Sequence, residues 1–281
     1  MIVVTGATGN IGRALVPLLA GAGEEVVAVS RRPQVDGLPA GARHIRADVG
    51  SSADLRPALD GARALFLLLG GELNAHGEHP DALVEAAAEA GVERIVLVSS
   101  QLTATRPDAP SHARLRAFET AVRASGLQAT VLRPSGFASN AYAWAETVRA
   151  RRTVLAPFAE VALPVIDPAD IAAVAAAALL ADGHAGRTYE LTGPAAVTPR
   201  EQAAAIGRAL GEEVAFVELS REQARHHLAQ LMPGDVADST LDVLGVPLPA
   251  EQAVGADVER VLGRPARPFG AWVERNLAAF R

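Results

Sequence analysis

The stretch Thr5-Gly6-Ala7-Thr8-Gly9-Asn10-Ile11-Gly12 decides the fold of this 281-residue chain, because it joins the apolar run Ile2–Thr5 to a helical pattern over Asn10–Ala22. Its first glycine permits a tight turn, its second lets a pyrophosphate approach the backbone, and its third lets the helix pack closely. The start of the helix offers N–H groups and a positive dipole end to phosphate. The stretch therefore predicts a phosphate-binding turn made by Thr5, Gly6, Thr8, Gly9, Asn10, Ile11 and Gly12.

Strand and helix patterns alternate through the first half of the chain. Apolar runs of strand length are Glu25–Ser30, Ala64–Leu69, Arg94–Ser99 and Gln128–Arg133, and His44–Val49 is expected as a shorter strand and turn. Helical patterns between them cover Ser52–Leu59, where Ser52 is the expected cap, Asp81–Ala90 and His112–Ser125. Continuous apolar strands are typical of a parallel sheet that helices cover on both faces. We therefore expect an α/β fold built on a Rossmann-like doubly wound parallel sheet.

The second half is less regular and predicts a smaller α/β C-terminal lobe. Short strands are expected at Thr153–Ala156, Thr188–Thr192 and Val214–Leu219, and helices at Ala138–Ala150, Pro168–Leu180, Thr198–Leu210, Ser220–Leu231, Val254–Leu262 and Phe269–Phe280. Thr198 with Glu201, and Ser220 with Gln223, have the spacing of capping boxes. We expect residues 1–150 to form the nucleotide-binding domain and residues 151–281 to pack on it as a substrate lobe, within one structural unit.

The composition excludes several classes of chemistry. The chain has no Cys, which excludes disulfides, thiolate catalysis and cysteine-ligated metal centres. All 26 basic residues are Arg, which excludes mechanisms that need lysine, and a net charge of -6 without basic runs argues against a nucleic-acid partner. Met1 leads directly into a strand, and the longest apolar run, Ile171 to Ala181, is too short to span a bilayer. We expect a cytoplasmic protein without a membrane partner.

Motifs along most of the chain resemble one branch of the short-chain dehydrogenase superfamily. Besides the Gly-x-x-Gly-x-x-Gly turn, they are Val98-Ser99-Ser100, Thr130-Val131-Leu132-Arg133-Pro134-Ser135-Gly136-Phe137, Asp167-Pro168-Ala169-Asp170-Ile171-Ala172 and Tyr189-Glu190-Leu191-Thr192-Gly193-Pro194. The chain resembles the atypical, NmrA-like group, which includes NAD(P)H quinone reductases, azoreductases, redox-sensing regulators and ergot-alkaloid reductase-like proteins. The resemblance implies a Rossmann fold and a nicotinamide dinucleotide, and it indicates hardly anything about the substrate.

The end of the second predicted strand favours NADP(H) over NAD(H). A site that prefers NAD usually has Asp or Glu there, whose carboxylate binds the ribose hydroxyls. Here the strand ends in Val29-Ser30-Arg31-Arg32. The guanidiniums of Arg31 and Arg32 suit a 2′-phosphate, and Arg13 is a third candidate. The alternative is that Arg31 and Arg32 are a solvated pair in a loop.

The resemblance adds further cofactor residues. It implies that Asp48 lies beside the adenine ring and that Leu69 and Gly70 lie near a cofactor ribose. Ser99, Pro134 and Gly136, at and after the ends of the fifth and sixth strands, are expected to complete the cofactor site.

The chain departs from the superfamily in its catalytic residues. Classical members use a Tyr whose pKa is lowered by a Lys four residues later. Those positions fall near Ser111 and Leu115, and the two tyrosines of the chain, Tyr142 and Tyr189, lie elsewhere. Alcohol–ketone chemistry by that pair is therefore excluded. Quinones, azo bonds and iminium ions accept hydride readily, so positioning can supply most of their catalysis.

Four residues are candidates for catalysis. Ser99 or Ser100 can hydrogen-bond a carbonyl, although either can instead cap the strand end. His112 is the best titratable candidate near the expected cleft, with a surface histidine at a helix start as the alternative. Tyr142 can line a substrate pocket or simply pack within the second lobe.

His76 and His79 superficially suggest a metal site. Their spacing is three rather than the four of His-Glu-x-x-His, and Gly77 and Pro80 argue against a helix there. We expect a polar loop over the cofactor edge and no metal.

Together these features predict an NADPH-dependent oxidoreductase that transfers hydride to a small conjugated or aromatic acceptor of quinone, azo or imine type. Two alternatives stay open, a non-catalytic NADP(H)-binding redox sensor and a redox-neutral tailoring enzyme on the same fold. The sequence leaves the acceptor and the oligomeric state undetermined.

Overall fold

A computed structural model describes residues 1–70, 76–230 and 232–281 of the chain. Its contacts divide into two compact units. The first consists of Met1–Pro134, Pro168–Glu190 and Arg260–Gly263, and the second of Ser135–Asp167, Leu191–Glu259 and Arg264–Arg281.

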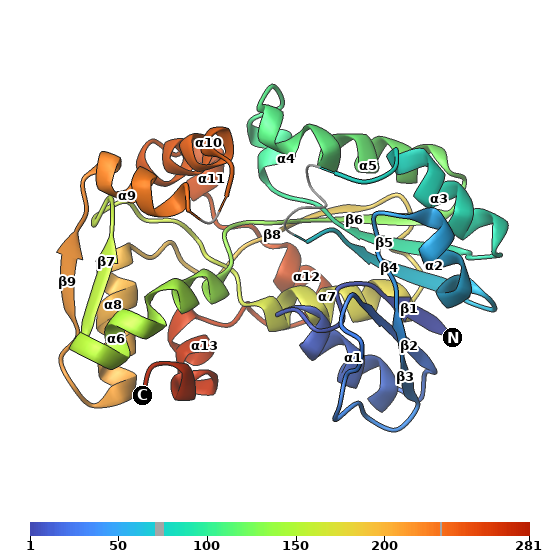
Figure 1. Ribbon diagram of the computed structural model, residues 1–281, viewed down its shortest axis with the longest axis horizontal. Helices are drawn as coiled ribbons and strands as arrows, with labels where there is room; N and C mark the ends of the chain where they lie inside the picture. The colour runs from blue at the N-terminus through green and yellow to red at the C-terminus, as the bar shows by residue number, and fades with distance from the viewer. Residues whose placement is uncertain (71–75, 231) are drawn as a thin grey trace. The chain divides into compact units, whose positions relative to one another are not determined.

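A seven-stranded sheet forms the centre of the first unit (Figure 1). Its strands are β1 (Ile2–Val4), β2 (Val26–Ser30), β3 (Ala42–Arg46), β4 (Ala64–Leu68), β5 (Arg94–Val98), β6 (Gln128–Pro134) and β8 (Thr188–Leu191). Their order is β3-β2-β1-β4-β5-β6-β8, and the pairs from β3 to β6 are parallel. The order reverses its direction after β1, which is the signature of a doubly wound sheet. The predicted Rossmann-like fold is confirmed.

Helices cover both faces of this sheet. They are α1 (Gly12–Gly21), α2 (Ser52–Leu59), α3 (Pro80–Glu89), α4 (Leu102–Thr105), η2 (Pro110–His112), α5 (Ala113–Ala124) and α7 (Pro168–Leu180). On one face α1 packs against α7, and on the other α3 packs against both α2 and α5 (Figure 1). Because each connecting helix runs back antiparallel to the strands, the helix starts gather at the carboxyl edge of the sheet.

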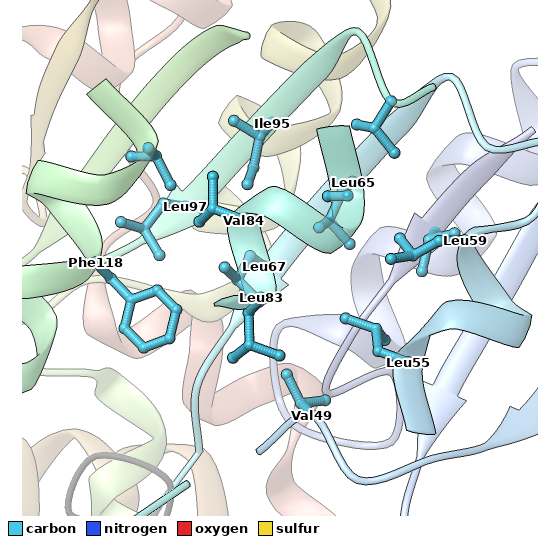
Figure 2. Close-up of a cluster of buried hydrophobic side chains, with 14 of the residues drawn as sticks. Val49, Leu55, Leu59, Leu65, Leu67, Leu83, Val84, Ile95, Leu97 and Phe118 are labelled. Atoms are coloured by element: carbon cyan, nitrogen blue, oxygen red, sulfur yellow. The ribbon is translucent and has the colours of Figure 1, made fainter. Parts of the chain in front are cut away.

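A hydrophobic core lies between the sheet and α2, α3 and α5 (Figure 2). Alternate residues of the central strands, such as Leu65, Leu67 and Leu97, point into it. Phe66 and Val96 point to the opposite face and are equally buried. Burial on both faces explains why these strands are continuous apolar runs in the sequence.

The second unit has a smaller sheet than the first unit and more short helices. Its strands, β7 (Thr153–Ala156) and β9 (Ala215–Glu218), form a parallel pair. Its helices are η3 (Ala138–Trp144), α6 (Ala145–Arg151), α8 (Pro199–Leu210), α9 (Arg221–Leu228), α10 (Gly234–Gly245), α11 (Pro249–Gln252), α13 (Phe269–Arg275) and η4 (Leu277–Ala279), and α12 (Asp257–Leu262) is divided between the units. Phe269, Trp272 and Phe280 lie in its hydrophobic core. The capping boxes predicted for α8 and α9 are both present.

Several local expectations need correction. Ser51, not Ser52, caps α2, because its hydroxyl accepts the amide N–H of Asp54 at 3.3 Å. The segment expected as one helix over Ala138–Ala150 begins as a 3-10 helix, and only its end is α-helical. The helix expected to reach Leu231 ends at Leu228, and Leu231 lies outside the described residues.

The helices α4, α10 and α11 were not expected from the sequence. Within the described ranges, no helix combines the length and the apolar character that crossing a membrane requires.

Candidate functional site

The glycine turn connects β1 to α1 and is fixed to the neighbouring strand by Thr5. This residue is fully buried. Its hydroxyl oxygen lies 3.1 Å from the carbonyl oxygen of Phe66 and accepts the N–H of Leu68 at 2.8 Å. The end of β1 is therefore held against the end of β4, and the turn that follows starts from a rigid point.

Close packing explains two of the glycines. Gly6 has φ of +62°, and a Cβ added to it would lie 2.9 Å from Leu68 Cδ2. A Cβ on Gly12 would lie 2.4 Å from the carbonyl oxygen of Gly6 and 2.5 Å from Ala7 Cα. A side chain at Gly12 would require movement of the backbone, and at Gly6 the positive φ strongly favours glycine. Gly9 is exposed, and its amide donates to Gly6 O at 2.9 Å.

The N-terminus of α1 is capped differently from those of α2 and α8. Ser51 and Thr198 cap α2 and α8 through their hydroxyls. At α1 the N-cap residue is Ile11, whose side chain makes no capping hydrogen bond, and the first turn has no acidic residue. The first N–H groups of a helix have no partner within the helix. The start of α1 therefore fits the pyrophosphate of a dinucleotide.

Arg31 and Arg32 follow β2 at the same edge of the sheet, and both are exposed. Ser30, just before them, is buried and lies 3.0 Å from Nε2 of His44 on β3. The register of the sheet pairs Ser30 with Arg46, which is also exposed. The corner formed by the ends of β2 and β3 thus has a third guanidinium, that of Arg46. The register of the strands reveals it, whereas the spacing of residues in the sequence does not.

The other predicted cofactor residues of the first unit also lie at the carboxyl ends of strands. Asp48 is exposed in the turn after β3, and its carboxylate accepts the amide of Gly50 at 2.9 Å. Leu69 and Gly70 follow β4, Leu69 buried and Gly70 exposed. Pro134 ends β6, and its carbonyl accepts the amide of Gln101 at 3.0 Å. Gly136 lies in the second unit.

A buried carboxylate connects the ends of β5 and β6 to α5. Glu119 accepts hydrogen bonds from Ser99 Oγ at 2.6 Å, from Thr103 Oγ1 at 2.7 Å and from Arg133 Nη2 at 2.7 Å. Arg123 adds a contact at 2.9 Å, and Arg133 also reaches Glu190 at 3.2 Å. Burial opposes ionisation of Glu119, but the hydrogen bonds from Arg133, Ser99 and Thr103 outweigh it and lower its pKa to about 2.

Ser99 and Ser100, the two serine candidates, therefore have different surroundings. The Ser99 hydroxyl donates to Glu119 within the buried network. Ser100 is half-buried, and its Oγ accepts the amide of Leu102 at 3.2 Å. Ser100 stands one residue further out from the sheet edge and is the better placed of the two to meet a substrate.

His112 is the last residue of η2 and the N-cap of α5, preceded by the short helix α4. Its Nδ1 lies 2.9 Å from Ser111 Oγ. Burial lowers the pKa of His112, and the positive charge of Arg116 lowers it further. Since α5 runs back along the sheet, His112 lies at the carboxyl edge.

Tyr142 lies in the second unit and is engaged in packing there. Its hydroxyl donates to Asn276 Oδ1 at 2.6 Å. Its ring meets that of Trp272 edge-on, with centroids 5.0 Å apart, and stacks on Phe280 at 6.3 Å. These contacts explain the position of Tyr142 without a substrate.

The His76–Pro80 loop makes hydrogen bonds to Gly50 and Ser52 and within the start of α3. The carboxylate of Glu78 accepts a hydrogen bond from the amide of Ser52 at 3.1 Å. The backbone amide of Glu78 donates to Gly50 O at 2.9 Å. His79 is the N-cap of α3 and accepts the amide of Asp81. In the part of the chain that the structure describes, no group of three or more His, Asp or Glu residues could hold a metal ion.

Comparisons with known proteins agree with this geometry. The model of an NAD(P)H-binding family matches residues 6–182. The chain is 38% identical to the (4-alkanoyl-5-oxo-2,5-dihydrofuran-3-yl)methyl phosphate reductase of Streptomyces griseus, over 100% of the chain and 99% of the relative. It is 32% identical to the NAD(P)H azoreductase of Xenophilus azovorans, over 100% of the chain and 99% of that relative.

A solved structure has the same fold over its whole length. The NADPH complex of an NADPH-dependent quinone oxidoreductase from Escherichia coli superposes with a TM-score of 0.78 at 25% identity, covering 99% of each chain. The resemblance to NmrA-like reductases inferred from the motifs is thereby confirmed.

Proposed function

The chain belongs to the NAD(P)H-binding family and is an NAD(P)H-dependent oxidoreductase, and from that premise we propose that it uses NADPH to reduce a small conjugated acceptor. The observation that carries the proposal is the glycine turn followed by a helix start without a side-chain cap. The acceptor takes a hydride at a carbon or nitrogen conjugated to an electron-withdrawing group.

The preference for NADPH rests on charge at the end of β2. No carboxylate follows the strand there, and Arg31 and Arg32 are exposed where a 2′-phosphate requires cations. Guanidinium groups bind phosphate through charge-assisted, often bidentate hydrogen bonds. A 2′-phosphate therefore adds affinity at this corner that NAD cannot gain.

The class of acceptor follows from the missing Tyr and Lys. Ser111 and Leu115 stand near the positions of that pair, so no strong general acid of this type polarises an unactivated ketone. The names of the relatives contain an unsaturated lactone phosphate, an azo bond and a quinone. All three are conjugated electrophiles that accept hydride without such activation, and we extend this class to the present chain.

The residues of the chain divide the work between binding and proton transfer. When bound, the cofactor supplies the hydride from its reduced nicotinamide ring. The turn from Thr5 to Gly12 holds the pyrophosphate. The Glu119 network fixes the end of β6 and the end of β5, which Ser99 and Ser100 follow. His112 donates the proton that balances the hydride, and solvent restores it, so that NADPH, acceptor and one proton give NADP⁺ and the reduced acceptor.

A redox sensor is the alternative that the missing pair of catalytic residues motivates. Such a protein would bind NADP(H) at the same turn and pass its redox state to a partner. A redox-neutral tailoring enzyme would bind the cofactor without net consumption. Turnover separates both from the reductase, because only the reductase consumes NADPH in proportion to the acceptor that is reduced.

The test is NADPH oxidation with a panel of three acceptors, a quinone, an azo dye and an α,β-unsaturated lactone. We expect at least one acceptor to be reduced with one NADPH consumed per two electrons, and NADH to support a lower kcat/KM. Binding of NADPH without turnover of any acceptor would contradict the reductase. Titration of the cofactor-free protein with NADPH and NADH in parallel serves as the binding control.

A further inference from the structure

Two arginines near the start of α5 carry N–H groups without acceptors. Arg116 Nη2 donates to Ala109 O at 3.0 Å, and Arg114 Nη2 donates to Glu78 O at 2.7 Å. In both side chains another nitrogen is buried and makes no hydrogen bond, Nη1 of Arg116 and Nε of Arg114. Buried donors of this kind are rare in folded proteins, so each needs an explanation.

Arg116 also has no carboxylate partner among the described residues. Two other half-buried arginines of the first unit, Arg94 and Arg133, form ion pairs with Asp182 and Glu119. Arg116 is half-buried, and its one hydrogen bond within the described residues goes to a backbone carbonyl. A partly desolvated guanidinium without a counter-ion attracts an anion from solution.

Polar groups on the same side of the helix start accompany Arg116. His112 lies one helical turn earlier. Its pKa is lowered by the burial of the ring and also by the positive charge of Arg116. Ser111 Oγ lies 2.9 Å from His112 Nδ1.

We propose that Arg116, beside the Ser111–His112 pair, binds a phosphate monoester group of the acceptor, an inference that rests on the proposed reductase function. The guanidinium offers N–H groups to the phosphate oxygens, among them the buried Nη1. The dianionic group of the acceptor supplies the charge that Arg116 lacks. Its binding places the conjugated part of the acceptor next to His112.

The site is distinct from those that hold the phosphates of the cofactor. The glycine turn follows β1 and the Arg31–Arg32 pair follows β2, whereas Ser111 and Arg116 belong to the connection after β5. In the sheet β4 separates β1 from β5. Strands are about 4.8 Å apart, which puts the two strand ends roughly 10 Å from each other.

The first test is calorimetric titration of phenyl phosphate into the protein saturated with NADP⁺, so that the phosphate sites of the nucleotide are filled. We expect wild type to bind phenyl phosphate and Arg116→Gln to bind it at least about tenfold more weakly. Arg116→Lys keeps the positive charge but loses the planar guanidinium that can donate two hydrogen bonds to one phosphate, and we expect an intermediate loss of affinity. Arg114→Gln is the matched control, because it removes a charge and a similar buried donor from the same helix and should leave the affinity unchanged.

Thermal unfolding of all three variants checks that they fold. Binding of phenyl phosphate only in the absence of NADP⁺ would assign it to the nucleotide sites and overturn the proposal. Equal binding by wild type and Arg116→Gln, or equal binding of benzoate and phenyl phosphate by wild type, would overturn it as well.

The second test uses turnover of a matched pair of acceptors, an unsaturated lactone with a hydroxymethyl substituent and its phosphate monoester. We expect Arg116→Gln to lower kcat/KM at least about tenfold for the phosphate ester and to leave the alcohol unaffected. Equal losses for both acceptors would overturn the phosphate assignment. If neither acceptor consumes NADPH, the reductase function fails for this class, while the titration still decides the phosphate site.

Discussion

Ser99 donates its hydroxyl to Glu119 across 2.6 Å, and this bond joins the end of β5 to the middle of α5. Arg133, at the end of the neighbouring strand, donates to both oxygens of the same carboxylate, at 2.9 and 2.7 Å. One buried anion thus fixes the two strand ends that carry Ser99, Ser100 and Pro134. The same bond commits the Ser99 side chain to the scaffold, whereas the side chains of Ser100 and His112 make their hydrogen bonds elsewhere.

The pKa of Glu119 makes this network sensitive to acid. Its folded pKa of about 2 lies below the ordinary value of 4.5, so its contribution to stability is complete above pH 4.5 and is lost as the pH falls towards 2. A shift of this size corresponds to about 3 kcal/mol. We expect Glu119→Gln to lower the free energy of unfolding by about 3 kcal/mol at pH 7 and by much less at pH 3, measured by urea denaturation at both values.

The comparison for this prediction is Glu89→Gln. Glu89 forms an ion pair with Arg56 at 2.7 Å, but both side chains are more than half exposed. Exposed pairs contribute little to stability, so we expect Glu89→Gln to change unfolding by less than about 1 kcal/mol at either pH. A loss at Glu119 that persists unchanged at pH 3 would mean that packing, and not the ionised carboxylate, holds the strand ends.

The sequence predicts the features that local chemistry decides. The glycine turn, the continuous apolar strands and the capping boxes at Thr198 and Ser220 each depend on residues close together in the chain, and the structure has all of them. The contacts of the Glu119 network join residues between 4 and 57 positions apart, so no spacing rule could find it. Arg46 belongs to the corner after β2 only through the register of β3. The helix α10, with no side-chain cap and Gly234 as its first residue, gave no start signal.

Preference for NADPH depends on the arginines after β2. We expect Arg31→Ala with Arg32→Ala to weaken NADPH binding by about 10- to 100-fold, because charge-assisted hydrogen bonds to the 2′-phosphate are lost, and to change NADH binding little. Calorimetric titration with both nucleotides measures the difference. Arg43→Ala is the control, since Arg43 is an exposed arginine on β3 whose register partner, Val27, points to the opposite face from Ser30. Equal losses for NADPH and NADH would assign the two arginines to another role.

Close packing at Gly12 predicts a strict requirement for glycine. A Cβ there would lie 2.4 Å from Gly6 O, so Gly12→Ala forces the turn and the start of α1 apart. We expect a loss of about 1–3 kcal/mol in stability and NADPH binding too weak to titrate. Gly21→Ala, at the other end of the same helix, meets nothing within 4 Å and should unfold like wild type or slightly later. Retention of normal NADPH affinity in Gly12→Ala would show that the turn does not carry the phosphates.

Proton donation by His112 predicts a particular pH profile. The protonated imidazole is the donor, and burial together with Arg116 lowers its pKa below the ordinary 6.5. The protonated fraction therefore falls as the pH rises through that lowered value, and kcat should decline about tenfold per pH unit above it. We expect His112→Gln to lose this slope and to reduce kcat by about 100-fold or more below pH 6, with the affinity for NADPH unchanged. His184→Gln is the matched control, because burial also lowers the pKa of His184, which contacts Tyr189 and precedes β8 at the amino edge of the sheet. A wild-type profile that is flat between pH 5 and 8, or the same slope in His112→Gln, would mean that the proton reaches the acceptor directly from water.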